Sequence, residues 1–109
     1  MIKKITIDFD ISGTKIIVPF EAVCTITSKK FQGFIVCEYH PKKEVLEYVD
    51  LERYTKDVTK DMLTAEELAH RVYIEIFNTI SPAYLKVIVD IKKSEAHQPV
   101  EVWVESKKY

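Results

Sequence analysis

Cys24 is the residue of this sequence best suited to covalent chemistry. It ends an apolar run and precedes a polar loop that carries Ser28, Lys29 and Lys30. One interpretation is a buried packing residue, which is the usual place of a lone cysteine. The other is a nucleophile, because neighbouring hydroxyls and lysines could lower the pKa of the thiol. The residue chemistry leaves both interpretations open.

The other cysteine and the histidines suggest no metal site. Cys37 alternates with apolar residues on a predicted strand, so we expect it in the core. The histidines, His40, His70 and His97, form no zinc-binding spacing with each other or with the cysteines. We therefore expect no metal. The two glycines of the chain are too few for a phosphate-binding loop or a dinucleotide fingerprint.

Two glutamates are candidate ligand-binding residues. Thr64 and Glu67 have the spacing of a capping box, which predicts a helix start there and leaves Glu66 without a structural role. Glu66 is either a carboxylate favoured by the helix dipole or one that binds the N–H edge of a heterocyclic base. Glu47, just before the first predicted helix, allows a structural or a functional role too.

Composition and charge limit the class of protein. The chain of 109 residues fits one domain over 1–109, and 47% hydrophobic with 30% charged residues is ordinary for a globular protein. Two cysteines indicate a reducing compartment, so we expect a cytoplasmic location. Asp8 and Asp10 interrupt any signal-peptide core, and no run approaches the about 18 apolar residues of a membrane span. The net charge of −1 excludes a globally basic surface.

The hydrophobic pattern predicts an α+β fold. Alternation predicts half-buried strands at 3–11, 15–20, 32–40, 84–92 and 99–105. The first two strands should form a hairpin through the turn at Gly13, and Pro19 marks a strand end or an edge strand. Lys42, Lys43 and Glu44 should form a turn.

Two helices are expected between the third and fourth of these strands. One should start at Asp50 as N-cap and bury Leu51, Tyr54 and Val58. The other should run from Thr64 to about Ile80 and end at Ser81-Pro82. Because strands and helices are segregated, we expect an antiparallel four-stranded sheet with two helices on one face.

In addition, the chain resembles the QueF family of tunnelling-fold enzymes over roughly residues 20–105. That family has a nucleophilic cysteine at the start of a strand, a Tyr-x-Pro after the strand, a glutamate opening the first helix, and a glutamate that holds a 7-cyano-7-deazaguanine (preQ0) ligand. The matching positions are Cys24, Tyr39, Pro41, Glu47, Leu51, Tyr54, Glu66, Pro82 and Tyr84.

The resemblance implies a branch of the family and a reaction. The reductase branch has Ser-Lys-Ser-Leu-Lys after the first glutamate for NADPH, whereas this chain has Tyr48-Val49-Asp50-Leu51-Glu52. This difference, with the short chain, resembles the archaeosine synthases, amidinotransferases that convert preQ0 in tRNA to a formamidine. A Cys24 thiolate would attack the nitrile carbon, ammonia would displace the sulfur from the thioimide, and Glu66 would bind the base. Ammonia would be a co-substrate, with no cofactor.

Phe31 departs from the family pattern, which places an acid/base aspartate seven positions after the cysteine. His40, Glu66 or Lys30 could take over proton transfer, or the chain could be a non-catalytic protein that binds preQ0 or tRNA. Ala65 also stands where reductase relatives carry a histidine. An NADPH-dependent nitrile reductase and a zinc-dependent pterin-type enzyme are the remaining alternatives.

The resemblance also implies partners. Tunnelling-fold subunits join their sheets into a barrel with sites between subunits, so we expect a homo-oligomer such as a pentameric or decameric ring. The other partner would be tRNA carrying preQ0, bound by surface stripes built from the chain's lysine pairs. No membrane partner is expected.

Overall fold

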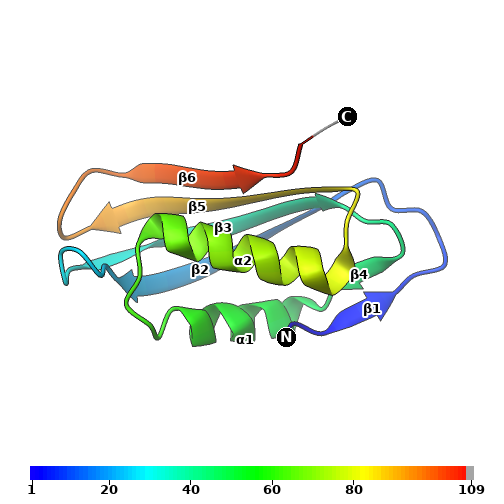
Figure 1. Cartoon of the computed structure of the whole chain (residues 1–109), viewed down its shortest axis with the longest axis horizontal. Coiled ribbons are helices and arrows are strands. Elements are labelled where there is room, and N and C mark those ends of the chain that lie inside the picture. Colours follow the sequence, from blue (N-terminus) through cyan, green and yellow to red (C-terminus); the bar gives the residue numbers. More distant parts are fainter. Residues whose placement is uncertain (108–109) are drawn as a thin grey trace.

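The computed structural model describes residues 1–107 and has an α+β architecture (Figure 1). An antiparallel sheet has the strand order β2-β3-β5-β6, formed by Thr14–Val23, Lys30–His40, Tyr84–Ser94 and Val100–Glu105. Helix α2, Ala65–Ile80, packs against β5 and β6, and helix α1, Tyr48–Val58, packs against β2. The expected four-stranded sheet with two helices is therefore confirmed.

The core lies between the sheet and the helices, because alternate strand residues point to one face. On β3, Ile35, Cys37 and Tyr39 are buried while Phe34 is exposed, as the sequence predicts. Strand β5 follows the same rule. Four fully buried residues of helix α2 complete the core opposite these strands: Leu68, Ala69, Val72 and Ile76. Cys37 is thus a packing residue, and burial raises the pKa of its thiol to about 12.

The prediction for the N-terminal segment is wrong in two respects. Strand β1 spans only Lys4–Thr6, and it pairs with a short strand β4, Glu44–Leu46, in a separate two-stranded sheet instead of forming a hairpin with β2. Ile5 and Phe9 are 50% and 62% exposed. Alternation shows that a segment can form a strand but not which surface it will meet. Here α2 packs on β4, where Leu46 is buried, whereas the side chains of Ile5 and Phe9 stay exposed. Of the turn predicted at Lys42, Lys43 and Glu44, the last residue is instead the first residue of β4.

The helix boundaries agree with the sequence except at the start of α1. Its N-cap is Glu47, whose carboxylate accepts hydrogen bonds from the backbone N–H groups of Val49 (3.3 Å) and Asp50 (2.5 Å). Asp50 lies inside the helix because it has a distant partner, the backbone N–H of Lys3 (2.6 Å), in addition to Arg53. In α2, Thr64 caps the N-terminus by accepting from the Glu67 N–H (3.1 Å), as predicted. Within residues 1–107, neither helix is long and apolar enough to span a membrane.

A β-bulge in β3 brings two strands unusually close together. The register between β3 and β5 shifts between Gln32 and Gly33. A Cβ on Gly33 would lie 1.9 Å from the backbone oxygen of Asp90, so only glycine fits there without movement of β5. Next to the bulge, Phe31 pairs with Ala22 of β2, so it lies at the same end of the sheet as Cys24.

Candidate active site

Cys24 lies directly after β2, in a tight loop that two backbone hydrogen bonds close. The Cys24 N–H donates to the Lys29 oxygen (2.9 Å), and the Ser28 N–H donates to the Cys24 oxygen (2.9 Å). Ser28 takes a left-handed conformation, with φ 58°, which lets the chain turn back into β3. The cysteine is half-buried and its thiol is free.

The loop lowers the pKa of the Cys24 thiol. The main cause is a hydrogen bond from the backbone N–H of Thr27; burial opposes it, and the Thr27 hydroxyl and the Ile26 N–H add to it. These groups favour the thiolate because each donates to a charged sulfur. Of the groups expected from the sequence, the hydroxyl of Thr27 does contribute. Lys30 instead forms an ion pair with Glu21, with 3.5 Å between Nζ and Oε1.

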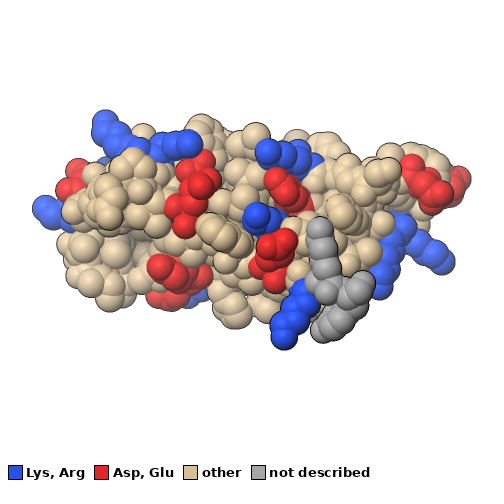
Figure 2. Space-filling view, turned by 90° about the horizontal axis from the view of Figure 1, so that it is seen from above, with Lys and Arg blue, Asp and Glu red and all other residues tan. Residues whose placement is uncertain are grey.

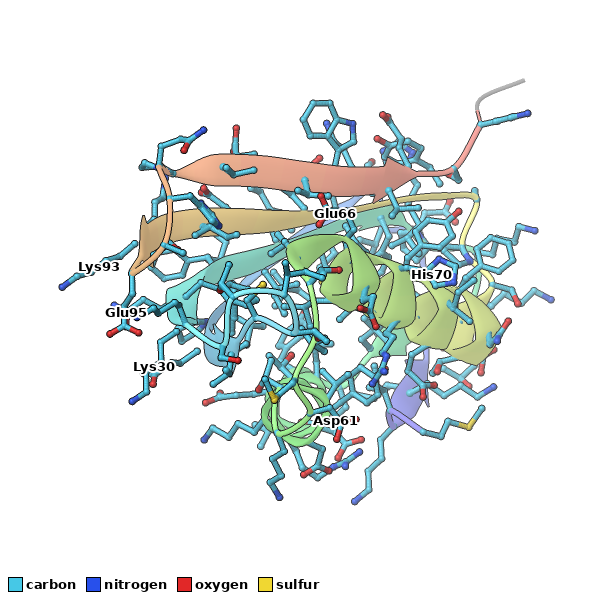
Figure 3. The ribbon with its side chains drawn as sticks, turned by 60° about the vertical axis from the view of Figure 1, so that its left-hand side comes forward. Lys30, Asp61, Glu66, His70, Lys93 and Glu95 are labelled. Atoms are coloured by element: carbon cyan, nitrogen blue, oxygen red, sulfur yellow. The ribbon has the colours of Figure 1, made fainter. Side chains whose placement is uncertain are left out.

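A backbone contact carries the start of α2 to Cys24. The N–H of Leu63, a fully buried residue, donates to the oxygen of Val23 at the end of β2 (3.1 Å). Thr64 caps the helix directly afterwards, so Glu66 is held in its first turn. Figure 3 shows Glu66 at this end of α2, close to the sheet.

The sequence-predicted residues Cys24 and Glu66 line one cavity of about 250 Å³. Its walls are otherwise mostly apolar, and it is small enough to suit a single heterocyclic base more than a dinucleotide. The negative charge of Glu66 raises the pKa of the Cys24 thiol, but this effect is smaller than the lowering by the Thr27 N–H. The other lining residues are Ile26, Phe31, Thr64, Ala65, Ile91, His97, Val100 and Val102.

Phe31 is a wall of this cavity and not a proton donor. It is 3% exposed, and its ring meets that of Phe20 edge to face with centroids 5.7 Å apart. Because so little of the ring is exposed, Phe31 contributes an apolar wall to the cavity.

His40 and Glu47 do not reach this cavity within one chain. His40 ends β3, nine residues beyond Phe31, which at about 3.3 Å per residue is roughly 30 Å along the strand. Its ring packs on Tyr84 with centroids 4.8 Å apart. Glu47 caps α1 beside β4, and both of its carboxylate oxygens accept from helix N–H groups. Their predicted roles stay predictions, and they would require a second subunit.

The sequence analysis missed His97 as a residue of this cavity. It lies in the loop between β5 and β6, and nothing in its spacing connects it to Cys24. Its only signal in the sequence is a histidine in a loop between two strands.

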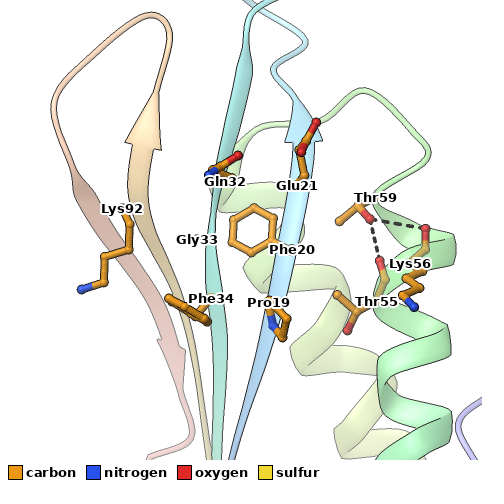
Figure 4. Close-up of a pocket in the computed structure, with 10 residues that line it drawn as sticks. All are labelled: Pro19, Phe20, Glu21, Gln32, Gly33, Phe34, Thr55, Lys56, Thr59 and Lys92. Carbon is orange, nitrogen blue, oxygen red and sulfur yellow. Dashed lines mark hydrogen bonds between the residues drawn. The ribbon is translucent and has the colours of Figure 1, made fainter.

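A second, larger hollow of about 500 Å³ lies between β2, β3 and α1 (Figure 4). It is lined by Lys56, Lys92 and Glu21 but by no cysteine or histidine. The Thr59 hydroxyl there donates to the helix oxygens of Thr55 (2.7 Å) and Lys56 (3.3 Å). Within residues 1–107, no group of three or more histidines, cysteines or carboxylates could hold a metal ion. The cavity at Cys24 is therefore the better candidate for an active site.

The chain matches no protein-family model. It is similar to a solved structure of the archaeosine synthase QueF-Like in the apo form, with a TM-score of 0.81 and 24% sequence identity. The similarity covers 90% of this chain and 96% of that chain. It confirms the tunnelling fold that the resemblance implies.

Proposed function

We propose that this chain is a tRNA-modifying amidinotransferase that converts preQ0 in tRNA to a formamidine through a Cys24 thioimide. The observation that carries the proposal is the cavity shared by Cys24 and Glu66, with a thiol whose pKa the Thr27 N–H lowers. The similarity to an archaeosine synthase adds support. A nitrile carbon is electrophilic, and a thiolate is the form of cysteine that attacks it.

The groups of the cavity have separate roles in this reaction. The sulfur of Cys24 adds to the nitrile carbon, and ammonia then takes its place. Glu66 accepts hydrogen bonds from the N–H edge of the base, while Phe31 and the other apolar side chains form the walls around it. Thr27 holds the sulfur ionised both before attack and when it leaves. The chain's own residues perform these steps without a redox cofactor.

Intact-mass analysis tests the covalent step. The protein is incubated with preQ0 base and then denatured. We expect a mass increase equal to the whole base, because addition of a thiol to a nitrile expels no group. Peptide mapping should place the adduct on Cys24 and leave the buried Cys37 unmodified. The same base without its nitrile is the control. If the wild type forms no adduct, or Cys24→Ala still forms one, covalent catalysis by Cys24 is excluded.

Turnover separates the proposal from its alternatives. We expect the formamidine nucleoside to form when the enzyme is mixed with tRNA carrying preQ0 and an ammonium salt. In a separate reaction with free preQ0 base and NADPH, we expect no change in the absorbance of NADPH. NADPH consumption would instead identify a nitrile reductase. The second candidate function is a non-catalytic protein that binds preQ0 or tRNA. It is favoured by the buried Phe31, which stands where the family has an acid. Binding without adduct or product would support it.

The proposed nucleic-acid surface lies around the cavity. The pairs Lys29–Lys30 and Lys92–Lys93 lie at the Cys24 end of the sheet, since Lys30 pairs with Val23 and Lys93 with Gln32. Figure 3 shows Lys30 and Lys93 projecting from this end. Two of these four lysines are in ion pairs, Lys30 with Glu21 (3.5 Å) and Lys92 with Asp90 (2.9 Å), so Lys29 and Lys93 are the better candidates for phosphate contacts. Figure 2, which views the β6 side, also shows acidic and basic side chains interspersed. A local basic edge can bind phosphates although the whole chain is near neutral.

A closed homo-oligomer is the proposed assembly. Strands β2 and β6 are the two edges of the larger sheet, and an unpaired edge is a template for another strand. Joining β2 of one subunit to β6 of the next would remove both edges and would give Glu47 and His40 a route to another subunit's cavity. Light scattering of the purified protein should give a mass of several subunits; a monomer at micromolar concentration would contradict this assembly.

A further inference from the structure

The proposed reaction needs a proton at the nitrile nitrogen, and the residues expected to supply it are poorly placed. Phe31 has no proton to give. Lys30 is outside the cavity and paired with Glu21, and His40 is at the far end of β3. Glu66 lines the cavity but is the group that would bind the base. A different acid must therefore act on the nitrogen as sulfur attacks carbon.

His97 lines the cavity together with Cys24 and Glu66. Local contacts hold its loop in place. The hydroxyl oxygen of Ser94 accepts from the N–H groups of Ala96 (3.1 Å) and His97 (3.3 Å). Glu95 then ties the loop to β3: its N–H donates to the Lys30 oxygen (3.1 Å), and its carboxylate accepts from the Lys30 N–H (2.9 Å). The sheet thus brings a histidine from the β5–β6 loop to the nucleophile that follows β2.

The hydrogen-bond partner of Nδ1 determines which ring nitrogen of His97 carries a hydrogen. Nδ1 lies 2.6 Å from the backbone oxygen of Gln98. A carbonyl oxygen only accepts, so Nδ1 must carry a hydrogen and donate it. Nε2 is then the nitrogen available for acid–base chemistry, and the carbonyl stabilises the ring when it is doubly protonated. A histidine oriented in this way through its other nitrogen is the usual arrangement of a general acid–base group.

We propose that His97 is the catalytic acid–base of the amidine-forming reaction, an inference that rests on the proposed function. As the Cys24 sulfur bonds to the nitrile carbon, one π bond of the nitrile breaks and its nitrogen takes the proton from Nε2, which leaves a thioimide and a neutral ring. Ammonia then bonds to the same carbon, gives one proton to Nε2, and the carbon–sulfur bond breaks to release the thiolate. The sum is nitrile plus ammonia to amidine, with Cys24 and His97 restored.

The test compares rates of thioimide formation from preQ0 base, measured by rapid quench and intact mass, in His97→Gln, His97→Ala and a matched control, His70→Gln. His70 is exposed on α2 and does not line the cavity. Loss of a general acid typically costs 10²- to 10⁴-fold, so we expect both His97 variants to be slowed at least about 100-fold and His70→Gln to be unchanged. Imidazole in the buffer should restore part of the rate of His97→Ala, because it can enter the space left by the ring.

Alkylation of Cys24 by iodoacetamide provides the second readout. It should be nearly unchanged in the His97 variants, because the groups that lower the pKa of the thiol belong to the Cys24 loop. The inference is overturned if His97→Gln forms the adduct at the wild-type rate, or if imidazole does not accelerate His97→Ala, which would assign His97 a role in loop structure. Failure of the wild type to form any adduct would instead remove the proposed function itself, so the two failures are distinguishable.

Discussion

Glu66 and Cys24 line the same cavity, and the negative charge of Glu66 raises the pKa of the Cys24 thiol. The Thr27 N–H lowers the pKa of the Cys24 thiol, whereas the negative charge of Glu66 raises it. A carboxylate that opposes formation of the thiolate does not help Cys24 to react, so we expect Glu66 to serve the proposed binding of the base instead.

Glu66→Gln should therefore separate thiol reactivity from base binding. Removal of the charge should lower the pKa of Cys24 further and speed its alkylation by iodoacetamide near neutral pH. Adduct formation with preQ0 should nevertheless fall, by roughly tenfold or more, because a hydrogen bond to a charged acceptor is worth about 1.5–3 kcal/mol. Glu67→Gln, which changes a carboxylate bound to the helix cap, is the matched control. Equal loss of both reactivities in Glu66→Gln would contradict this division of roles.

Thr27→Val should make Cys24 less reactive. The variant keeps the backbone N–H that is the main cause of the lowered pKa but removes the hydroxyl that adds to it. The pKa of the thiol should rise, and alkylation below that pKa should slow by roughly two- to fivefold, as expected for one hydrogen bond. A pH series of alkylation rates measures the shift. Thr25→Val, in the same loop, should leave the pKa unchanged; an equal shift in both variants would point to distortion of the loop.

Asp50 should make stability depend on pH at the acid end. Hydrogen bonds from the Arg53 side chain and then the Lys3 N–H lower the pKa of its carboxyl to about 2. Because the folded-state pKa lies below the unfolded value of about 3.9, this stabilisation is complete above about pH 4 and is lost as the pH falls through about 2. Asp50→Asn should unfold at a lower temperature than wild type at pH 7, and the difference should shrink toward pH 2. Thermal melts followed by circular dichroism measure it; a constant difference would refute the linkage.

Gly33→Ala should destabilise the fold by about 2 kcal/mol, because the new Cβ would lie 1.9 Å from the Asp90 oxygen and force the strands apart. Gly13→Ala is the control: its Cβ would lie 3.5 Å from the nearest atom, a ring carbon of His40, which is ordinary contact. Its free energy of unfolding should change by less than about 1 kcal/mol. Urea denaturation measures both variants, and equal stability of the two would show that β5 yields at the bulge.

Replacement of Lys29 and Lys93 by alanine should weaken tRNA binding and reduce its dependence on salt. Each lost phosphate contact should lower the slope of log affinity against log salt concentration by roughly 0.7–0.9. The matched control replaces Lys42 and Lys43, which precede β4 at the other end of β3 from Cys24. Filter binding across a salt series gives both slopes. If the control pair changes the slope as much as the first pair, the tRNA surface lies elsewhere.

Local patterns were enough to predict most elements. Alternation determined which side chains of β3 and β5 are buried, and the capping box located the start of α2. These predictions succeed because a strand or a capped helix turn depends on residues a few positions apart. The start of α1 was misjudged because Asp50 binds Lys3, a partner that lies on another segment.

By itself, the sequence determined the α+β class, the buried faces of β3 and β5 and the choice of Cys24 and Glu66 as candidates. Only the tertiary structure decided which residues meet. The bond from Leu63 to Val23 carries Glu66 to Cys24, strand pairing carries His97 to the same cavity, and the length of β3 keeps His40 away. The physical reason is that periodicity reports which face of an element is buried, whereas a site depends on contacts between distant segments that the whole core must position.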